Sequence, residues 1–367
     1  MKALCHREGL LSAVQLASAA IPARDVKPIL RNFKAIAEEG RCTLMATDLE
    51  LGIRLEVRGL KVEEPGEAIL PAAKLLAILR ECPDEELRVE ADANACQVSG
   101  VNGNWEMPSE DPANFPDLPA FTEEKYHQVT AGQLREMIRR TAFAAATDVG
   151  RYSMTGVLWE LDAEKVRLVA TDGRRLALME GPAQAQGGHT TKGQTPVVPT
   201  KAMTLLERNL QDDDEVVRIS FRPNEVLFRT ERATVYSRLV EGRFPNYRDV
   251  FPKKQKSTVP LPVGGFLAAV RQAAIMTDED SKKVVFRFAK RKLTLEAQGS
   301  VGGRSKIDMP LEYDGKGADI NFNPAFLVDM LRVLEPETPL TLELVDGASP
   351  ALFHTEDHYQ YLLMPLS

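Results

Sequence analysis

One pattern recurs three times along the chain, at nearly constant spacing. A proline precedes a short helix-like run, an acidic turn follows, and a strand-like run closes the pattern. The pattern begins at Pro71, Pro199 and Pro324, which are 128 and 125 residues apart. Apolar residues four and seven positions after each proline share one helix face, and they are Leu75 and Ile78, Met203 and Leu206, and Val328 and Leu331. A spacing this long indicates repeated domains rather than short solenoid units.

Clusters of proline and charge separate the three copies. They occur around residues 116–125 and 252–258. We therefore predict domains at residues 1–121, 126–252 and 257–367. Each range is long enough to bury a core of its own.

Within each copy, helical and strand patterns alternate, and strands outnumber helices. The first helix of each copy is expected at residues 10–20, 131–147 and 263–277. Apolar and polar residues alternate over 49–57, which predicts a half-buried antiparallel strand. Asp172-Gly173 is a hairpin turn signal, and residues 181–194, rich in Gly, Gln and Thr, are expected to be a mobile surface loop. The fold class predicted is α+β.

Composition narrows the class of protein. Of the 367 residues, 44% are hydrophobic and 27% are charged, as in ordinary globular proteins. No apolar run approaches the roughly 20 residues of a membrane span, and the charged N-terminus does not read as a signal peptide. We therefore expect a soluble cytoplasmic protein with no membrane partner, whose four cysteines are reduced and mostly buried.

Motifs for catalysis are missing from the sequence. It contains neither a Gly-x-Gly-x-x-Gly run nor a Walker loop, and no catalytic set of Ser, His, Asp or Cys residues can be proposed. His354 and His358 have the spacing of metal ligands on a helix, but a hairpin turn is expected there. The acidic run 212–215 is better explained as a solvated turn than as a cation site. We predict no catalytic residues, no metal and no cofactor.

Charge leaves two interpretations open. The formal net charge of −7 argues against a nucleic-acid binder, yet binding depends on local patches. Cations gather on the expected helices, with Arg135 and Arg139 four residues apart on one face. They are either ordinary helix surface or a cationic lining set against an acidic exterior.

Several segments resemble the bacterial DNA polymerase III beta subunit, the DNA sliding clamp. They are residues 170–177, 198–201, 237–247 with Pro252, 322–323 and 361–366. The run Leu-Val-Glu-Gly-Arg-Phe-Pro-Asn-Tyr at 239–247 is the most specific of them, and the resemblance covers the whole chain. It implies three clamp domains per chain and a head-to-tail homodimer ring, with helices lining the lumen and antiparallel sheets outside. Such a ring encircles duplex DNA without sequence preference and confers processivity on the replicative polymerase; it needs no catalytic site.

The resemblance also implies three groups of site residues. Client peptides would bind at Met154, Thr171, Gly173, Arg174, Arg175, Leu176, Pro245, Val250, Asn323, Phe326, Leu362, Leu363, Met364, Pro365 and Leu366. DNA would contact Arg24, Arg151 and Tyr152, and the dimer interface would use Lys74, Trp105, Ile275 and Met276. The residues themselves suggest an apolar wall, with Arg174 and Arg175 as anchors for a carboxylate.

The partners implied are duplex DNA, a second copy of the chain and short linear motifs of client proteins. These clients are the polymerase alpha subunit, clamp-loader subunits, and other polymerases and repair proteins, at the nucleoid. A clamp-fold interaction scaffold that does not encircle DNA is the alternative, and a ring-loading assay separates the two. An enzyme ranks last.

Overall fold

The structure is a computed structural model that describes residues 1–22, 27–148, 153–252, 256–278 and 282–366. The chain divides into two compact units. Unit 1 comprises residues 1–134, 184–189 and 201–239, and unit 2 comprises residues 135–183, 190–200 and 240–367.

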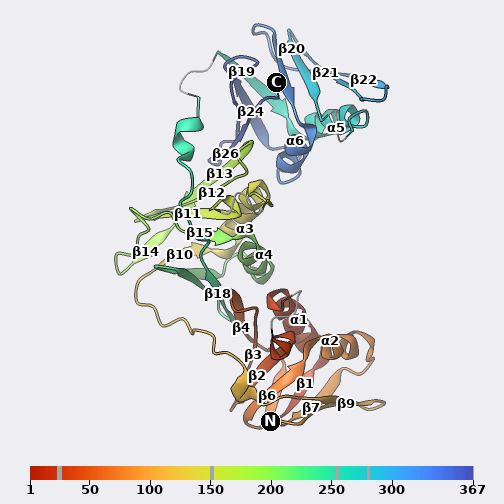
Figure 1. Cartoon of the computed structure of the whole chain (residues 1–367), viewed down its shortest axis with the longest axis vertical. Helices are drawn as coiled ribbons and strands as arrows, with labels where there is room; N and C mark the ends of the chain where they lie inside the picture. The colour runs from red at the N-terminus through yellow and green to blue at the C-terminus, as the bar shows by residue number, and fades with distance from the viewer. Residues whose placement is uncertain (23–26, 149–152, 253–255, 279–281, 367) are drawn as a thin grey trace. The chain divides into compact units, whose positions relative to one another are not determined.

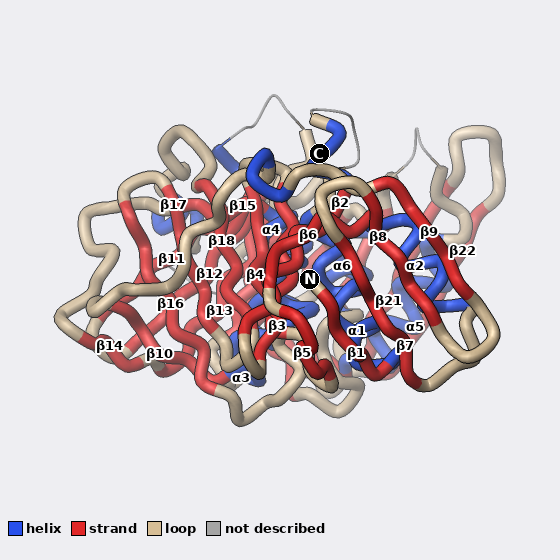
Figure 2. The backbone as a smooth tube through the Cα atoms, turned by 90° about the horizontal axis from the view of Figure 1, so that it is seen from below, coloured by secondary structure: helices blue, strands red, loops and turns tan. Residues whose placement is uncertain are grey.

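Three copies of one element order make up the chain. Each copy runs strand, helix, strands, helix, strands, which confirms the predicted α+β class with three domains (Figure 2). The first helices are α1 (Arg7–Ala17), α3 (Ala131–Thr141) and α5 (Val263–Ala274). The second helices are α2 (Ala72–Glu81), α4 (Thr200–Asn209) and α6 (Pro324–Leu331).

Unit 1 contains two antiparallel sheets. The smaller has the order β5 (Leu60–Glu64), β1 (Lys2–His6), β7 (Glu86–Ala91), β8 (Ala95–Ser99), β9 (Asn104–Pro108). The larger has nine strands in the order β14 (Gln184–Gln186), β10 (Tyr126–Thr130), β16 (Val216–Arg222), β17 (Glu225–Arg229), β18 (Ala233–Arg238), β4 (Leu51–Glu56), β3 (Arg41–Thr47), β2 (Asn32–Glu38), β6 (Gly66–Pro71). Helices α1 and α2 pack on each other, and α1 also contacts β3 and β4.

Unit 2 contains the other two sheets, which are also antiparallel. The larger has the order β15 (Val197–Pro199), β11 (Gly156–Asp162), β12 (Lys165–Thr171), β13 (Arg175–Pro182), β26 (Tyr359–Leu363), β25 (Ala351–His354), β24 (Pro339–Leu344), β19 (Ser257–Pro262). The smaller has the order β22 (Arg304–Pro310), β21 (Lys292–Gln298), β20 (Val284–Ala289), β23 (Ala318–Phe322). Helices α5 and α6 pack on each other, and α5 covers β21 and β22.

Successive copies are joined strand to strand in the same way. By element order, β4, β13 and β22 are equivalent strands, and β9, β18 and β26 are equivalent strands. The second copy's β18 pairs with the first copy's β4, and the third copy's β26 pairs with the second copy's β13 (Figure 1). Strands β9 and β22 are left at sheet edges.

The second helices show why the repeat is visible in the sequence. Pro71 is the N-cap of α2 and Pro199 immediately precedes α4, since proline suits a helix start. In α6 the N-cap is Asn323, whose side chain accepts a hydrogen bond from the Ala325 amide, and Pro324 is already the first helical residue. The predicted register of the third copy is therefore wrong by one residue: Val328 is half-buried, and Leu327 is the fully buried match to Leu75 and Met203.

Two further expectations need correction. The strand predicted over 49–57 begins only at Leu51, because Asp48 accepts hydrogen bonds from the Glu50 and Leu51 amides and forms a turn there. The segment 181–194 is not a mobile surface loop. Part of it forms β14 at the sheet edge. The side chains of His189 and Thr191 are buried, with exposed fractions of 9% and 3%.

The four cysteines are free and buried, as predicted. Burial raises the pKa of the Cys5 thiol to about 12 and that of the Cys42 and Cys96 thiols to about 11. These thiols are therefore not ionised near neutral pH. Across the described residues, no helix has both the length and the apolar character needed to span a membrane.

Candidate peptide-binding site

The turn between β12 and β13 is built by one carboxylate. Asp172 Oδ1 accepts hydrogen bonds from the amides of Arg174 (2.9 Å) and Arg175 (3.0 Å). Thr171 Oγ1 donates to the Arg175 carbonyl at 2.6 Å and accepts from the Gly173 amide at 3.0 Å. Gly173 has a φ of 84°, a left-handed conformation that favours glycine. The predicted Asp-Gly hairpin is confirmed.

Arg175 is buried and contacts several parts of unit 2. Its guanidinium donates to Asp172 (3.1 Å), to Asp329 on α6 (2.6 Å) and to the Phe143 carbonyl (2.9 Å). It also lies over the rings of Phe326 and Phe143, 4.6 and 5.4 Å from their centroids. The sequence suggested Arg175 as an anchor for a ligand carboxylate. In the structure its guanidinium is already engaged by these partners.

Strand register divides the apolar site residues between two faces of one sheet. Arg175 pairs with Leu363 and Leu176 pairs with Leu362, so the two pairs point to opposite faces. Leu176 and Leu362 belong to a cluster with Leu158, Val169, Leu178, Val197, Phe244 and Tyr247. Arg175 and Leu363 lie on the other face, so they support the site from behind and do not line the same surface.

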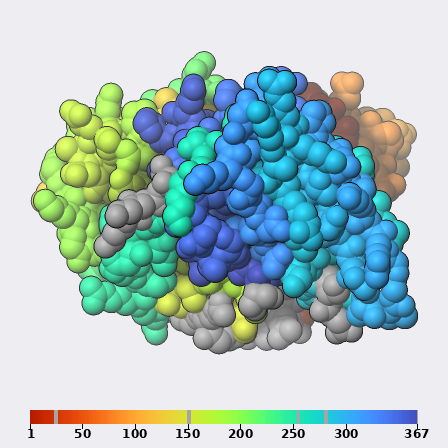
Figure 3. Space-filling model, turned by 90° about the horizontal axis from the view of Figure 1, so that it is seen from above, coloured from red at the N-terminus to blue at the C-terminus, as the bar shows by residue number. Residues whose placement is uncertain are grey.

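Five of the predicted residues are exposed on the surface of unit 2. Gly173, Arg174 and Pro245 are exposed, and Val250 and Met364 are 42% and 40% exposed. The Met364 amide donates to the Arg174 carbonyl at 2.9 Å, which places the C-terminal segment beside the hairpin turn. Residues of the C-terminal part of the chain, dark blue in Figure 3, are exposed on the face shown there.

The remaining residues have identifiable structural roles. Asn323 caps α6, and the Phe326 carbonyl accepts a hydrogen bond from the Tyr361 hydroxyl at 2.9 Å. The Leu366 amide donates to the Asn321 carbonyl at 2.8 Å, and this bond holds the half-buried Pro365-Leu366 end. Met154, also half-buried, precedes β11.

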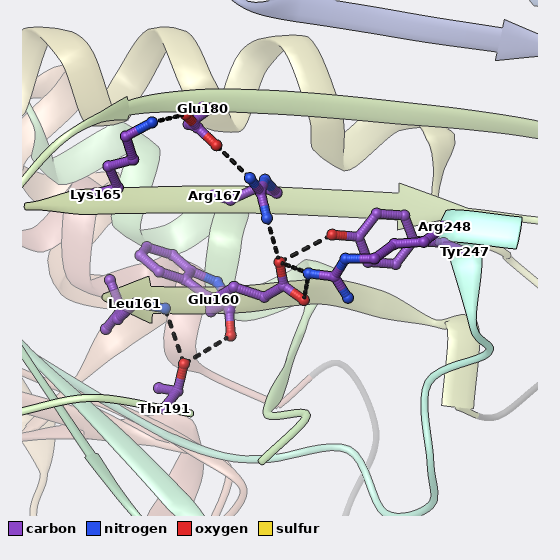
Figure 4. Close-up of polar contacts among 9 residues, drawn as sticks. Glu160, Leu161, Lys165, Arg167, Glu180, Thr191, Tyr247 and Arg248 are labelled. Atoms are coloured by element: carbon purple, nitrogen blue, oxygen red, sulfur yellow. Dashed lines mark hydrogen bonds and ion pairs between the residues drawn. The ribbon is translucent and has the colours of Figure 1, made fainter. Parts of the chain in front are cut away.

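A polar network fixes the segment that carries Pro245 and Val250 (Figure 4). Glu160 on β11 accepts hydrogen bonds from Arg167 (2.8 Å), from the Tyr247 hydroxyl (2.8 Å) and from Arg248 (2.8 and 2.7 Å). Burial opposes ionisation of Glu160, but these three donors hold its pKa below the usual value. Burial, and then the Glu160 carboxylate, raise the pKa of Tyr247 to about 12, so Tyr247 stays protonated as a donor.

A cavity of about 250 Å³ adjoins this network. Its walls include Leu178, Tyr247, Arg248, Phe251 and Gln360. Leu178 follows Leu176 by two residues on β13, and Gln360 precedes Leu362 by two on β26. The cavity therefore continues the face that carries Leu176 and Leu362.

The sequence did not reveal the residues that hold this site. Asp172 had a local signal, because it lies inside the Thr-Asp-Gly turn. Asp329 and Phe143 had none, because they meet Arg175 from 154 and 32 positions away in the chain. Glu160 was equally hidden, since Tyr247 and Arg248 approach it from 87 and 88 positions away.

The other predicted site residues lie elsewhere. Lys74 is exposed on α2, Trp105 lies on β9, and Ile275 and Met276, which directly follow α5, are 72% and 38% exposed. Arg24, Arg151 and Tyr152 lie outside the described residues. His354 contacts Glu343 at 3.2 Å from β25, and His358 lies in the following turn with a φ of 65°. Within the described ranges, no group of three or more His, Cys, Asp or Glu side chains could hold a metal ion.

Repeated α+β domains joined through equivalent strands define the class of clamp folds. The sequence matches the DNA polymerase III beta subunit N-terminal domain over 1–119, the central domain over 128–246 and the C-terminal domain over 248–367. The chain belongs to the DNA polymerase III beta subunit family.

Individual relatives match along their full length. The beta sliding clamp of Pseudomonas putida is 29% identical over 366 residues, 98% of each chain. That of Escherichia coli K12 is 28% identical over 369 residues, all of both chains. The crystal structure of the DNA polymerase III subunit beta from Pseudomonas aeruginosa is 28% identical, covers 100% of both chains and superposes with a TM-score of 0.90. A crystal structure of that clamp bound to griselimycin superposes with a TM-score of 0.92 at 28% identity, and the match covers 100% of this chain and 99% of that one.

Proposed function

We propose that this chain is a DNA sliding clamp, a processivity factor that closes as a head-to-tail homodimer around duplex DNA. It has no catalytic role of its own in this proposal. One observation carries it: β9 and β22, each at the edge of its sheet, are the equivalents of the two kinds of strand that form each joint within the chain. The relatives named beta sliding clamps support the same conclusion.

The free edges are complementary by position in the repeat. Each internal joint pairs the last strand of one copy with the fourth strand of the copy before it, as β18 with β4 and β26 with β13. The last strand of the first copy is β9 and the fourth strand of the third copy is β22. An exposed edge is a template for another strand. A second chain can therefore supply β22 to β9 by the same antiparallel pairing, and two such contacts close a ring.

Side chains beside these edges support the dimer. A cavity of about 320 Å³ lies between α2 and Trp105, lined in part by Ala77, Ile78 and Cys82. Ile275 and Met276 are exposed apolar residues, and Met276 lies against the loop that leads into β22. We assign Ile275 to this cavity on the partner and place Lys74 at its margin. Burial of exposed apolar side chains supplies the association energy.

Contact with DNA is assigned to cations on the helices. Exposed basic residues occur on α2, α4 and α5 and at the end of α6: Lys74, Arg80, Lys201, Arg208, Arg271 and Arg332. A lumen lined by such residues attracts phosphates without reading bases, so a net charge of −7 is compatible with a ring around DNA. Arg24, Arg151 and Tyr152 belong to the same proposal.

Client proteins are assigned to the surface around Arg174, Pro245, Val250 and Met364, above Leu176 and Leu362. The proposed clients carry short Gln-plus-hydrophobic motifs and include the polymerase alpha subunit, clamp-loader subunits, other polymerases and repair proteins. Few anchors imply an affinity of roughly micromolar or somewhat tighter. The domain boundaries proposed remain 1–121, 126–252 and 257–367, and the place of action is the nucleoid in the cytoplasm.

Retention on circular DNA tests the topological link. The protein is loaded by its clamp loader and ATP onto a nicked circular plasmid, which is then passed through a gel-filtration column at high salt. A sliding clamp stays with the circle and is released when a restriction enzyme linearises the DNA. Failure to remain on circular DNA, with client peptides still bound, would instead favour the clamp-fold scaffold.

A further inference from the structure

A second cavity, in unit 1, is lined by four arginines. Its volume is about 270 Å³, and Arg41, Arg54, Arg229 and Arg232 contribute to its walls. It lies across strands β3, β4, β17 and β18 and is bordered by Phe121 from the segment between the first two copies. None of these residues takes part in the peptide, dimer or DNA sites described above.

Strand register accounts for the convergence of the arginines. Arg229 on β17 pairs with Thr234 on β18, and Thr234 pairs with Arg54 on β4. Directly paired residues of antiparallel strands project from the same face, about 5 Å apart. The two guanidinium groups therefore approach the cavity from either side of Thr234. This row crosses the joint between the first and second copies.

Of the four arginines, Arg41 is ion-paired with Glu38, whereas the positive charge of the other three is only partly balanced by the protein. Glu56 is the only carboxylate among the residues lining this cavity. Of the described residues, none places a carboxylate within 4.0 Å of the guanidinium groups of Arg54, Arg229 or Arg232. Their acceptors are neutral: the Leu118 carbonyl for Arg54 (3.2 Å), Thr234 Oγ1 for Arg229 (3.2 Å) and Gln211 Oε1 for Arg232 (2.7 Å).

The pKa values of two of these arginines are lowered by their surroundings. Burial lowers the pKa of Arg229; the charge of Glu56 opposes this, but the nearby charges of Arg218, Arg41 and Arg54 lower the pKa further. Burial and then Arg58 lower the pKa of Arg232. An anion in the cavity would relieve both effects, because it supplies the missing opposite charge.

We propose that this arginine pocket binds a small molecule carrying two or more linked phosphates. Guanidinium groups match phosphate oxygens with paired hydrogen bonds, and several are needed to balance a polyphosphate. The volume suits a ligand of nucleotide size and is too small for a duplex. Phe121, half-buried and in edge contact with Tyr126 at 6.0 Å, offers a wall for a base. A bound ligand would link β4 to β18 and so stabilise the joint between two copies.

Titration calorimetry on the full-length protein tests the pocket, with tripolyphosphate, ADP and inorganic phosphate as ligands. We expect one site per chain for tripolyphosphate and for ADP, with inorganic phosphate at least about tenfold weaker because it engages fewer guanidinium groups. The variants Arg54→Gln and Arg229→Gln should each weaken tripolyphosphate by about tenfold or more. Arg229→Lys, which keeps the charge but loses the paired geometry, should fall between wild type and Arg229→Gln.

The control is Arg238→Gln, at an exposed arginine on β18, the strand between β4 and β17; it makes the same change in charge outside the pocket. It should leave the affinity within about twofold. Phe121→Ala distinguishes a nucleotide ligand from a plain polyphosphate. Weaker binding of ADP alone indicates a nucleotide, and unchanged affinity for both ADP and tripolyphosphate indicates a plain polyphosphate. Equal losses in Arg238→Gln, or no binding at millimolar ligand, overturn the proposal. Displacement of tripolyphosphate by duplex DNA at equal phosphate concentration would assign the pocket to the DNA backbone instead.

Discussion

Neighbouring arginines in one turn have opposite roles in the structure. Arg175 points behind the sheet to Asp172 and Asp329, whereas Arg174 is exposed beside Met364. The strand alternation that begins at this turn separates them. Of these two arginines, Arg174 is exposed and Arg175 is buried.

This separation predicts different effects for two alanine variants. Arg175→Ala should lower stability by about 2–4 kcal/mol, because Asp172 and Asp329 lose their shared partner in a partly buried site. Arg174→Ala should leave the melting temperature nearly unchanged and weaken client peptides several-fold. Differential scanning fluorimetry and peptide calorimetry on both variants check this. Equal loss of stability in the two variants would contradict the assigned roles.

A buried histidine pair joins β10 to the segment 181–194, which composition assigned to a mobile loop. His127 and His189 approach through their Nδ1 atoms at 2.7 Å, and the Phe221 amide donates to His189 Nε2 at 3.2 Å. Burial, and then the charge of His127, lower the pKa of His189 to about 4. The surroundings of His189 therefore favour its neutral imidazole.

This pair predicts a pH dependence of stability. The pKa of His189 in the folded protein lies below the 6.5 of an unfolded histidine, so the unfolded chain takes up the proton first. The stability that neutral His189 contributes is complete above pH 6.5, and about 3 kcal/mol of it is lost as the pH falls towards 4. In urea unfolding, His189→Gln should show a smaller fall than wild type over this range. His6→Gln, an exposed histidine in the same unit, is the control and should behave like wild type.

At the scale of elements, backbone hydrogen bonds hold the C-terminal segment. After β26, the Met364 amide bonds to Arg174 and the Leu366 amide bonds to Asn321. These two bonds place the last residues against the β12–β13 turn and beside β23. Residues 364–366 are therefore held to unit 2 by backbone hydrogen bonds.

Deleting Met364–Ser367 should abolish peptide binding and leave dimerisation and DNA association intact. The deletion removes an exposed apolar side chain and both anchoring bonds, but it stops beyond the paired residues of β26. Calorimetry with a motif peptide and sedimentation of the same sample measure the two outcomes. An unchanged peptide affinity would move the site elsewhere.

At the scale of the whole molecule, the joint pattern predicts assembly. Strands β9 and β22 each pair with a neighbouring strand on one side only. Their equivalents in the other copies also pair across a joint between copies. A second copy of the chain resolves both edges at once.

Placing charges at the proposed interface should therefore separate the chains. The double variant Ile275→Glu with Met276→Glu should sediment as a monomer, because carboxylates cannot enter an apolar cavity beside Trp105 without a large desolvation cost. Val216→Glu, at an apolar residue 48% exposed on β16, is the matched control and should remain a dimer. A dimeric double variant would place the interface elsewhere.

The threefold repeat, the α+β class, the helix starts and the β12–β13 hairpin all follow from the sequence alone. Each depends on neighbours within a few residues: a proline before a helix, an alternating run, or an aspartate followed by glycine. The family resemblance could likewise be read from short runs. These features are local, so they depend only on residues that are neighbours in the sequence.

Only the tertiary structure decided which side chains meet. It joined β18 to β4 and β13 to β26, gave Arg175 its partners from α6 and the 142–144 turn, and brought Arg54 and Arg229 into one pocket. It also shifted the third repeat by one residue and buried His189 within a polar segment. The physical reason is the same in each case. These contacts depend on strand register and burial between positions far apart in the chain, and a one-residue change in register turns a side chain to the opposite face.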